Sequence, residues 1–347
     1  MDIDVRSLVD SGQDQVEIAE AIADYIGEAK RSLDIALYDL RLGAVTAPIV
    51  VAAIKAASAR GVAGRVVYNI DHDKPIAVPP PPRTDDGLVD HLGLSSKAIP
   101  GIPDLMHHKY IVRDSTSVWT GSMNWTDDSF TREENVIIKV ASPAIASMYS
   151  RDFEDLWSTG QVQGSGGFTS APAQVDGHEV RAWFCPGRGR RLAHRVATAI
   201  GRASTRVSIC SPVLTSGPIL GAALDLASEG HVRVEGLIDL TQMQEVIGQW
   251  REKPQSSWKI EAFERLISAG SFKGKHSTPY APGRVHDYMH AKMVVADDVV
   301  FIGSYNLSHS GEANAENVLE IKGRPIADRI SQVIEEMRAR YDEARFQ

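Results

Sequence analysis

The chain has 347 residues, enough for two domains or for one large domain with an internal repeat. Its 43% hydrophobic and 24% charged residues fit a soluble globular protein, and no apolar run approaches the roughly 18 residues that span a bilayer. A net charge of −8 argues against a surface devoted to nucleic acid, and two cysteines are too few for a disulfide framework. Residues 1–15 lack a signal-peptide pattern, so we expect a cytoplasmic protein.

The first part of the sequence predicts alternating helices and strands. Apolar residues recur every three or four positions at 16–30 and 48–60, as on one face of a helix. Residues 32–38 and 65–70 have the pattern of strands. The order strand, helix, strand predicts two parallel strands joined by a right-handed connection.

Residues 71–106 break this regularity and include four consecutive prolines at 79–82. The segment is either a surface insertion or a rim over a site, because it leads directly into a polar motif at residue 107. Its Asp71-His72-Asp73 triplet has the chemistry of metal ligands, although such triplets are commoner as plain surface. We therefore predict no metal and no cofactor.

The second part repeats the plan of the first. A helix is expected at 142–157, and the Gly-, Ser- and Pro-rich residues 160–177 predict a linker. The remaining expected elements are helices at 192–203 and 218–228, strands at 206–210 and 232–238, helical residues at 242–270, a loop at 271–284 and a closing helix at 326–341. The chain thus divides into a first half at 1–160, a linker at 161–177 and a second half at 178–347.

One cluster of polar residues occurs in each half. The second half contains His290 and Lys292, two positions apart and so on one face of a strand, followed by Asp297, Ser304, Asn306 and Glu316. The first half contains His107, Lys109, Asp114, Ser122, Asn124 and Glu134 in the same order. The asparagine precedes the glutamate by ten residues in both copies, 124 to 134 and 306 to 316. Such self-similarity predicts two related structural units.

This duplicated H-x-K-x4-D pattern, with trailing G-S-x-N and E-N, resembles the phospholipase D superfamily of phosphodiesterases. The resemblance covers most of the chain and is strongest at the motifs. It implies an α/β fold of two pseudo-symmetric α/β/α halves, each a mixed, mostly parallel sheet flanked by helices, with both motifs at the seam. Two ordinary hairpins would leave the repeated spacing unexplained, and intact motifs argue against a binding protein with a decayed site.

The resemblance also implies a site that handles a phosphate group without a metal. The groups expected to bind phosphate are the side chains of Lys109, Lys292, Ser122, Asn124, Ser304 and Asn306, all of them hydrogen-bond donors. One histidine would attack phosphorus and form a covalent phosphohistidine, while the other protonates the leaving oxygen. Analogy favours His107 as the nucleophile.

Other motif residues are assigned supporting roles. Glu134 and Glu316 are expected to orient the two histidines, as the third member of a catalytic triad does. Asp114 and Asp297, five residues past their lysines, are expected to be structural, as is His108 on the opposite strand face.

The first hypothesis for the substrate is DNA or RNA, which makes the protein a nuclease. It rests on basic residues that would contact a polyanion: Arg188, Arg190, Arg191, Lys273, Lys275 and Arg284. The competing interpretation is an ordinary solvated charged face, because acidic residues outnumber basic ones overall.

The alternative is a phospholipase D that releases the head group from glycerophospholipids by hydrolysis or transphosphatidylation. Residues 75–82 and 212–220 would supply an apolar rim for a membrane surface. The missing signal and spanning segments count against the secreted phospholipases and cardiolipin synthases of the family. The sequence leaves open the acceptor, the oligomeric state and whether the enzyme works alone or within a larger system.

Overall fold

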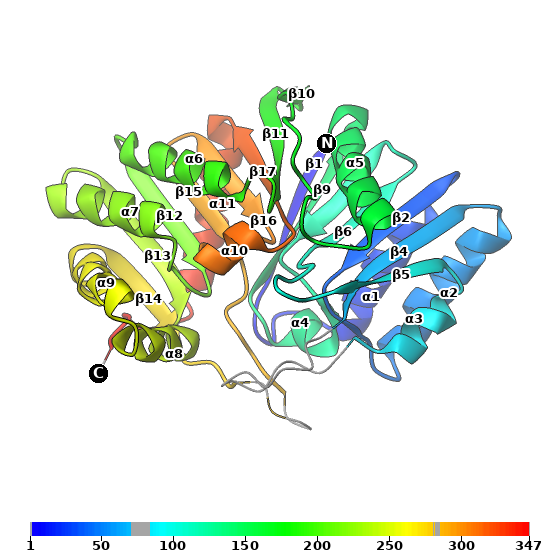
Figure 1. The fold of residues 1–347 in the computed structure, drawn as a ribbon, viewed down its shortest axis with the longest axis horizontal. Coiled ribbons are helices and arrows are strands. Elements are labelled where there is room, and N and C mark those ends of the chain that lie inside the picture. Colours follow the sequence, from blue (N-terminus) through cyan, green and yellow to red (C-terminus); the bar gives the residue numbers. More distant parts are fainter. Residues whose placement is uncertain (1, 71–83, 280, 282–284, 347) are drawn as a thin grey trace.

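The computed structural model describes residues 2–70, 84–279, 281 and 285–346, and it shows two α/β halves side by side (Figure 1). Each half has a mixed sheet with helices on both faces, and the N- and C-terminal halves of the chain lie at opposite sides of the view. The expected two-halved α/β architecture is therefore present. Asp71-His72-Asp73, the prolines at 75–82 and Arg284 lie outside the described residues.

The first sheet has the strand order β1-β9-β7-β6-β2-β4-β5. Its strands are β1 Ile3–Leu8, β2 Ser32–Leu37, β4 Ala63–Ile70, β5 Ser95–Pro100, β6 Lys109–Arg113, β7 Ser117–Gly121 and β9 Asn135–Ala141. Strands β2, β4 and β5 are parallel, as the strand–helix–strand order predicts, whereas the other neighbours are antiparallel. The sheet is mixed but not mostly parallel, because hairpins connect its later strands.

The second sheet repeats this order with one strand added, β10-β11-β17-β16-β15-β12-β13-β14. Its strands are β10 Ala173–Val175, β11 His178–Cys185, β12 Arg206–Ser211, β13 Arg233–Asp239, β14 Ser271–Lys275, β15 Met293–Ala296, β16 Val299–Gly303 and β17 Glu316–Lys322. Again only β12, β13 and β14 are parallel neighbours. A short pair, β3 Leu40–Arg41 and β8 Trp125–Thr126, lies beside the first sheet.

The helices cover both sheets (Figure 1). They are α1 Gln15–Gly27, α2 Thr46–Ala59, α3 Asp86–Leu92, α4 Asp127–Thr131, α5 Pro143–Thr159, α6 Gly189–Gly201, α7 Gly217–Glu229, α8 Leu240–Arg251, α9 Trp258–Ala269, α10 His309–Ala313 and α11 Arg324–Arg338. Local sequence explains their ends: Ser142 caps the first turn of α5, Pro143 begins it, and Gly160 ends it in a left-handed conformation.

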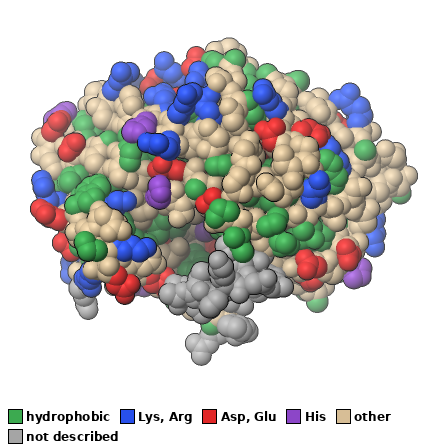
Figure 2. All heavy atoms as spheres, viewed as in Figure 1, with side chains coloured by type: hydrophobic (Ala, Val, Ile, Leu, Met, Phe, Trp, Pro, Cys, Tyr) green, Lys and Arg blue, Asp and Glu red, His purple; other side chains and the backbone are tan. Residues whose placement is uncertain are grey.

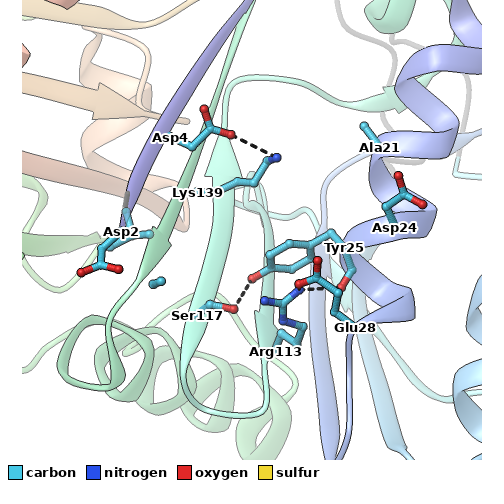
Figure 3. Close-up of a pocket in the computed structure, with 11 residues that line it drawn as sticks. Asp2, Asp4, Ala21, Asp24, Tyr25, Glu28, Arg113, Ser117 and Lys139 are labelled. Atoms are coloured by element: carbon cyan, nitrogen blue, oxygen red, sulfur yellow. Dashed lines mark hydrogen bonds and ion pairs between the residues drawn. The ribbon is translucent and has the colours of Figure 1, made fainter. Parts of the chain in front are cut away.

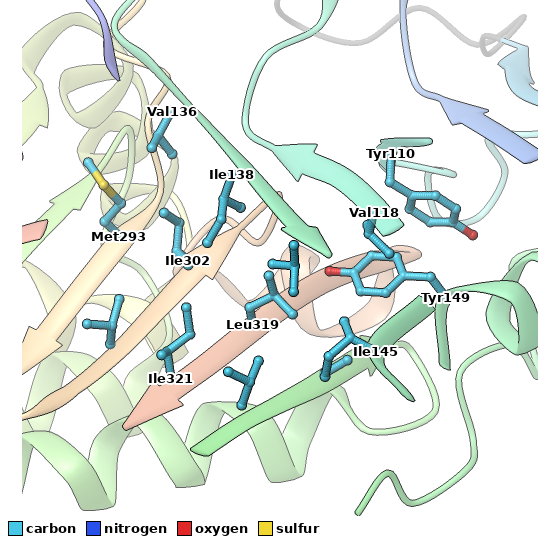
Figure 4. Close-up of a cluster of buried hydrophobic side chains, with 14 of the residues drawn as sticks. Tyr110, Val118, Val136, Ile138, Ile145, Tyr149, Met293, Ile302, Leu319 and Ile321 are labelled. Carbon is cyan, nitrogen blue, oxygen red and sulfur yellow. The ribbon is translucent and has the colours of Figure 1, made fainter. Parts of the chain in front are cut away.

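One hydrophobic core crosses the seam between the halves (Figure 4). Ile138 of β9 and Val118 of β7 lie in the same cluster as Ile302 of β16 and Leu319 of β17. Helix α5 adds side chains to this cluster, among them Tyr149. The two halves therefore share buried apolar surface and do not merely touch at a polar interface.

Three segments differ from their expected structure. Residues 71–106 contain α3 and β5, and residues 271–284 begin with strand β14. The expected linker at 161–177 is tied down, because Val162 is fully buried and β10 pairs with β11. In each case, tertiary pairing orders a stretch whose local composition is typical of loops.

Candidate active site

The segments that carry the motif histidines pair with the opposite half of the molecule. The backbone N–H of His107 donates to the carbonyl of Ala315, 2.9 Å away, and the N–H of His290 donates to the carbonyl of Glu134, also at 2.9 Å. The first hydrogen bond belongs to an isolated β-bridge between Met106 and Ala315. The second belongs to an isolated β-bridge between Met289 and Glu134. The fold thus places each histidine next to the residue that precedes a strand of the other half, β17 or β9.

The two imidazoles face each other across the seam. Their ring centroids are 6.5 Å apart, with the ring planes inclined at 79°. Lys109 donates from Nζ to the carbonyl of His107 at 2.7 Å, and Lys292 makes the same contact to the carbonyl of His290. Both lysines are buried, so two imidazoles and two amines converge in a space sheltered from water.

Glu316 faces His107 across the seam. Its Oε1 atom lies 2.8 Å from Nδ1 of His107, and its Oε2 atom accepts a hydrogen bond from Oγ of Ser304 at 2.5 Å. The carboxylate is therefore fixed on one side by its own half and faces the histidine of the other. This is the position expected of Glu316.

Glu134 does not have the equivalent role, which corrects the expectation from spacing. A Cβ on Gly121 would lie 2.1 Å from the carbonyl oxygen of Val136, and a Cβ on Gly303 would lie 2.1 Å from that of Asn317. Val136 thus corresponds to Asn317, so that Asn135 corresponds to Glu316 and Glu134 to Ala315. Asn135 lies eleven residues after Asn124, whereas Glu316 lies ten residues after Asn306, so the first half has one additional residue in this stretch.

A shift of one residue in an extended chain moves a side chain to the other face. Glu134 accordingly turns away from the histidines, and its Oε2 accepts a hydrogen bond from Nζ of Lys275 at 2.8 Å. Its Oε1 accepts one from the hydroxyl of Tyr341. The sequence contains two adjacent glutamates here, Glu133 and Glu134. The prediction chose Glu134 only because it lies ten residues after Asn124, as Glu316 does after Asn306.

Asn135 and Glu133 face His290 instead. Nδ1 of His290 lies 3.2 Å from Oδ1 of Asn135 and 3.6 Å from Oε2 of Glu133. Oδ1 of Asn135 also accepts a hydrogen bond from Ser122 at 2.7 Å. The two histidines are thus oriented by different chemistry, an amide for His290 and a carboxylate for His107.

The motif serines are buried behind the site, which corrects their assignment to phosphate binding. Ser122 and Ser304 are completely buried, and their Oγ atoms also accept the backbone N–H of Val136 and Asn317. Because these hydroxyls are fully occupied, they position Asn135 and Glu316. The amide oxygens of Asn124 and Asn306 have no hydrogen-bond partner among the described residues. The donors of these amides are their Nδ2 groups, and these are the motif amides that we expect to bind a phosphate oxygen.

Burial and mutual repulsion hold the groups at the site close to neutrality. Burial, followed by the charges of Lys109 and Lys292, holds the pKa of His107 well below its usual value. Burial lowers the pKa of Lys109 to about 7 and raises the pKa of Glu316 to about 8. A bound anion would favour the protonated forms of the lysines and histidines, because its negative charge attracts their positive charge.

Tyr38, which no motif in the sequence includes, borders the same group. Its ring centroid is 4.6 Å from that of His107, and Nζ of Lys109 lies 4.7 Å from the centre of the Tyr38 ring. The phenol ring therefore packs on both motif residues of the first half.

The motif aspartates lie at the far ends of their strands. The Asp114 carboxylate accepts hydrogen bonds from the backbone N–H groups of residues 30–32, and that of Asp297 accepts those of residues 204–206. His108 is fully buried beside Asp152, with 3.0 Å between Nε2 and Oδ2. None of these three residues faces the paired imidazoles, in keeping with the structural roles expected for them.

The basic residues expected to contact a polyanion fall into two groups. Lys275 is buried against Glu134, so it is excluded from that role, and Lys273 forms an ion pair with Glu343 at 2.7 Å. Arg188, Arg190 and Arg191 instead line a cavity of about 420 Å³ at the start of α6. Figure 2 shows Lys and Arg side chains gathered on this face near α6.

A cavity of about 440 Å³ lies on the first half and includes no motif residue (Figure 3). Both basic groups that line it are paired with acidic ones: Lys139 with Asp4 at 3.1 Å and Arg113 with Glu28. Tyr25 and Ser117 share a hydrogen bond of 2.9 Å. These internal pairs leave the cavity without the converging donors of the motif site.

A metal cluster and a membrane-spanning helix are both absent from the part of the chain that the structure describes. Within ranges 2–70, 84–279, 281 and 285–346, no group of three or more His, Cys, Asp or Glu side chains is placed to hold a metal ion. Over the same ranges, no helix combines the length and apolar character needed to cross a membrane.

The sequence matches one family model and parts of two curated proteins. Residues 22–157 and 196–338 match the family described as "Cardiolipin synthase, PLD-like domain". A mitochondrial cardiolipin hydrolase of Xenopus tropicalis is 31% identical over 130 residues, which cover 37% of this chain and 56% of that protein. Its counterpart in Xenopus laevis is 42% identical over 52 residues, 15% of this chain and 25% of that protein. The chain thus spans about half, or less, of the length of these relatives.

Among solved structures, the phosphatidylserine synthase of Haemophilus influenzae Rd KW20 is similar, with a TM-score of 0.66. The match covers 96% of this chain and 85% of that one at 15% sequence identity. At this identity, the similarity shows that the two proteins share a fold.

Proposed function

The chain belongs to the phospholipase D superfamily, and from this premise we propose that it hydrolyses phosphodiester bonds in glycerophospholipids through a covalent phosphohistidine. The observation that carries the proposal is the facing pair His107 and His290, 6.5 Å apart between ring centroids, with two buried lysines beside them. Converging cationic and amide donors suit a phosphate group and the charge that develops on it in the transition state.

The first step forms the covalent intermediate. His107 attacks phosphorus through Nε2, because its Nδ1 faces Glu316. The bond from phosphorus to the leaving oxygen breaks, and His290 gives its proton to that oxygen. The Glu316 carboxyl, 2.8 Å from Nδ1, stabilises the positive charge that the phosphorylated ring carries.

In the second step, His290 accepts a proton, whereas in the first step it donated one. Water attacks phosphorus and gives a proton to His290, while the nitrogen–phosphorus bond breaks and His107 returns to its starting form. The products are an alcohol and a phosphate monoester, which for a glycerophospholipid is phosphatidate. Lys109 and Lys292 balance the charge on the non-bridging oxygens throughout.

Two observations support a lipid over a polynucleotide. The matching family model and both curated relatives carry names that refer to cardiolipin, a phospholipid. Of the six basic residues that the nuclease hypothesis used, Lys275 is buried and Lys273 is paired with Glu343. The cluster Arg188, Arg190 and Arg191 suits an anionic bilayer surface, where each basic residue contributes roughly 1 kcal/mol of attraction.

A nuclease is the second candidate. The same arginine cluster could also bind the phosphate backbone of a nucleic acid, because electrostatic attraction does not distinguish one kind of phosphate from another. The net charge of −8 makes general attraction to a polynucleotide weak, so this reading depends on that one cluster.

We would test the substrate by offering three labelled substrates in EDTA: cardiolipin vesicles, phosphatidylcholine vesicles and single-stranded DNA. The wild type is expected to release phosphatidate from lipid, and His107→Asn should lower this rate by at least about a thousandfold, because it removes the nucleophile. Cleavage of DNA alone, abolished by the same substitution, would replace the lipid proposal with the nuclease. Inhibition by EDTA that is reversed by added metal would contradict the metal-free chemistry.

A further inference from the structure

A further histidine, outside the two motifs, is buried near His290. His286, from the segment that leads into β15, is 6% exposed and reaches the first half of the molecule. Its Nδ1 atom lies 3.0 Å from Oδ2 of Asp128, and its Nε2 atom lies 3.2 Å from Oε1 of Glu133. One imidazole thus bridges two carboxyl groups of the opposite half.

Glu133 continues the contacts from His286 to the site. Its Oε2 accepts hydrogen bonds from Oγ of Ser129 at 2.6 Å and from Nδ2 of Asn135 at 3.1 Å. The same Oε2 is 3.6 Å from Nδ1 of His290, and Asn135 faces that nitrogen at 3.2 Å. A continuous set of contacts therefore runs from Asp128 through His286, Glu133 and Asn135 to His290.

The charges along this set of contacts alternate. Burial alone would lower the pKa of His286, but Asp128 and Glu133 raise it to about 9. Burial alone would raise the pKa of Glu133, but His290 and His286 hold it below its usual range. His286 is therefore an imidazolium at neutral pH beside an ionised Glu133. Lys292 and Lys109 are the other charged groups that act on His290.

The surroundings of His107, the other motif histidine, lack the equivalent contacts. By the register of the two halves, Glu133 corresponds to Asn314, whose Oδ1 accepts the backbone N–H of Leu105 at 2.9 Å. The residue four positions before His107 is Pro103, where the other motif has His286. One half of the fold thus forms without such a bridge, so the bridge is not a general requirement of the architecture.

We propose that His286 is a positioning residue, which holds Glu133 and Asn135 so that His290 keeps the orientation needed to protonate the leaving oxygen. The assignment of that proton transfer to His290 rests on the proposed function. His286 itself touches neither imidazole of the motif pair through any contact described above. It acts through Glu133 and Asn135, and its loss should impair proton donation rather than substrate binding.

The test compares two phosphodiesters that differ only in the acidity of the leaving phenol, a p-nitrophenyl diester and the matching phenyl diester. A p-nitrophenolate leaves without help from an acid, whereas a phenolate needs a proton. His286→Gln should therefore lower kcat/KM on the phenyl diester by at least about tenfold and on the p-nitrophenyl diester by less than about threefold. The comparison uses kcat/KM because it reports the step in which the phenol leaves and not the later attack of water, which is common to both substrates.

Two further variants support this comparison. His276→Gln changes an exposed histidine of the same segment and should leave both rates unchanged. His286→Arg keeps a cation between Asp128 and Glu133 and should recover part of the rate on the phenyl diester. The ratio of the two rates does not depend on how much of the variant is folded, so partial misfolding cannot imitate the expected result.

Equal losses on the two diesters would show that His286 is merely structural and would overturn the proposal. An unchanged rate on the phenyl diester would overturn it as well. If the wild type cleaves neither diester, the proposed function itself fails, and the proton-donor role of His290 fails with it. If it cleaves both diesters but no phospholipid, only the lipid assignment is lost, and the role of His286 is still judged by the ratio.

Discussion

The two motif histidines differ in the group that faces their Nδ1 atoms. His107 has the Glu316 carboxyl at 2.8 Å, whereas His290 has the amide oxygen of Asn135 at 3.2 Å and a carboxylate farther away. A carboxyl group next to an imidazole can ionise when the ring becomes positively charged, and it then stabilises that charge more than an amide does. This difference gives a physical reason, beyond family analogy, to propose His107 as the nucleophile that becomes the cationic phosphohistidine.

At the same scale, binding of an anion should be linked to proton uptake. Burial of the amine lowers the pKa of Lys109 to about 7, and a bound anion would raise it. Above pH 7, binding must therefore add a proton, so affinity should weaken as pH rises, by up to about tenfold per pH unit for one linked proton. Ionisation of Glu316, with a pKa of about 8, adds negative charge and acts in the same direction.

Calorimetry with a non-hydrolysable phosphonate monoester, whose charge is constant over this range, would measure the effect in two buffers of different ionisation enthalpy. The Lys109→Met variant is the control and should lose most of the proton uptake. Affinity that stays constant or improves between pH 7 and 9 would contradict the linkage.

At the scale of elements, the register of β9 against β7 decides which side chains enter the site. Gly121 packs against the carbonyl of Val136, and that contact fixes Asn135, not Glu134, opposite Ser122. In the other half, Gly303 and Asn317 make the same contact and place Glu316. The side chains of an extended strand alternate, so one extra residue in the preceding loop exchanges the residue that faces the histidine.

The hairpin after β15 gives a prediction about stability. The Asp297 carboxylate accepts three backbone N–H bonds, of 2.7 to 3.1 Å, from residues 204–206. Asp297→Ala should lower the free energy of unfolding by about 1–3 kcal/mol, because these donors lose their acceptor. The value of kcat should not change, since the side chain does not face the site. Thermal unfolding measures the loss, and Asp298→Ala, at an exposed neighbour, is the control.

The same substitution has a characteristic pH dependence. Burial alone would raise the pKa of Asp297, but hydrogen bonds from Thr205, Ser204 and Arg206 lower it. A lowered pKa in the folded protein gives stability that is present above the ordinary carboxyl pKa of about 3.9 and is lost as the pH falls. The difference between wild type and Asp297→Ala should therefore shrink in acid, and a difference that grows there would contradict this account.

At the scale of the whole molecule, the halves form one unit both in packing and at the site. The hydrophobic cluster that includes Ile138 and Ile302 crosses the seam, and each motif histidine meets orienting groups from the opposite half. Neither half can therefore present a complete site on its own.

Unfolding should accordingly be a single cooperative transition. Scanning calorimetry is expected to give one peak with equal calorimetric and van't Hoff enthalpies, because unfolding one half would expose the shared core of the other. Ile138→Ala and Ile302→Ala, one in each half, should both shift that whole peak to lower temperature. Two separate peaks, only one of which responds to each substitution, would show instead that the halves unfold independently.

The repeated spacing of histidine, lysine and aspartate was enough to predict the two-halved fold, the family and the pairing of His107 with His290. These features are local patterns, and a duplicated pattern implies a duplicated structural unit. The sequence also pointed to Glu316. It could not separate Glu133 from Glu134, because which one faces the seam depends on a one-residue offset in a loop.

Only the tertiary structure decided the supporting groups of the site. Asn135, Glu133 and His286 come to His290 from both halves, through pairing across the seam that leaves no spacing rule in the sequence. Lys275 likewise looked like an exposed cation until strand pairing buried it against Glu134. Local patterns specify which residues a strand contains, whereas the partners of a buried charge depend on which strands meet and in what register.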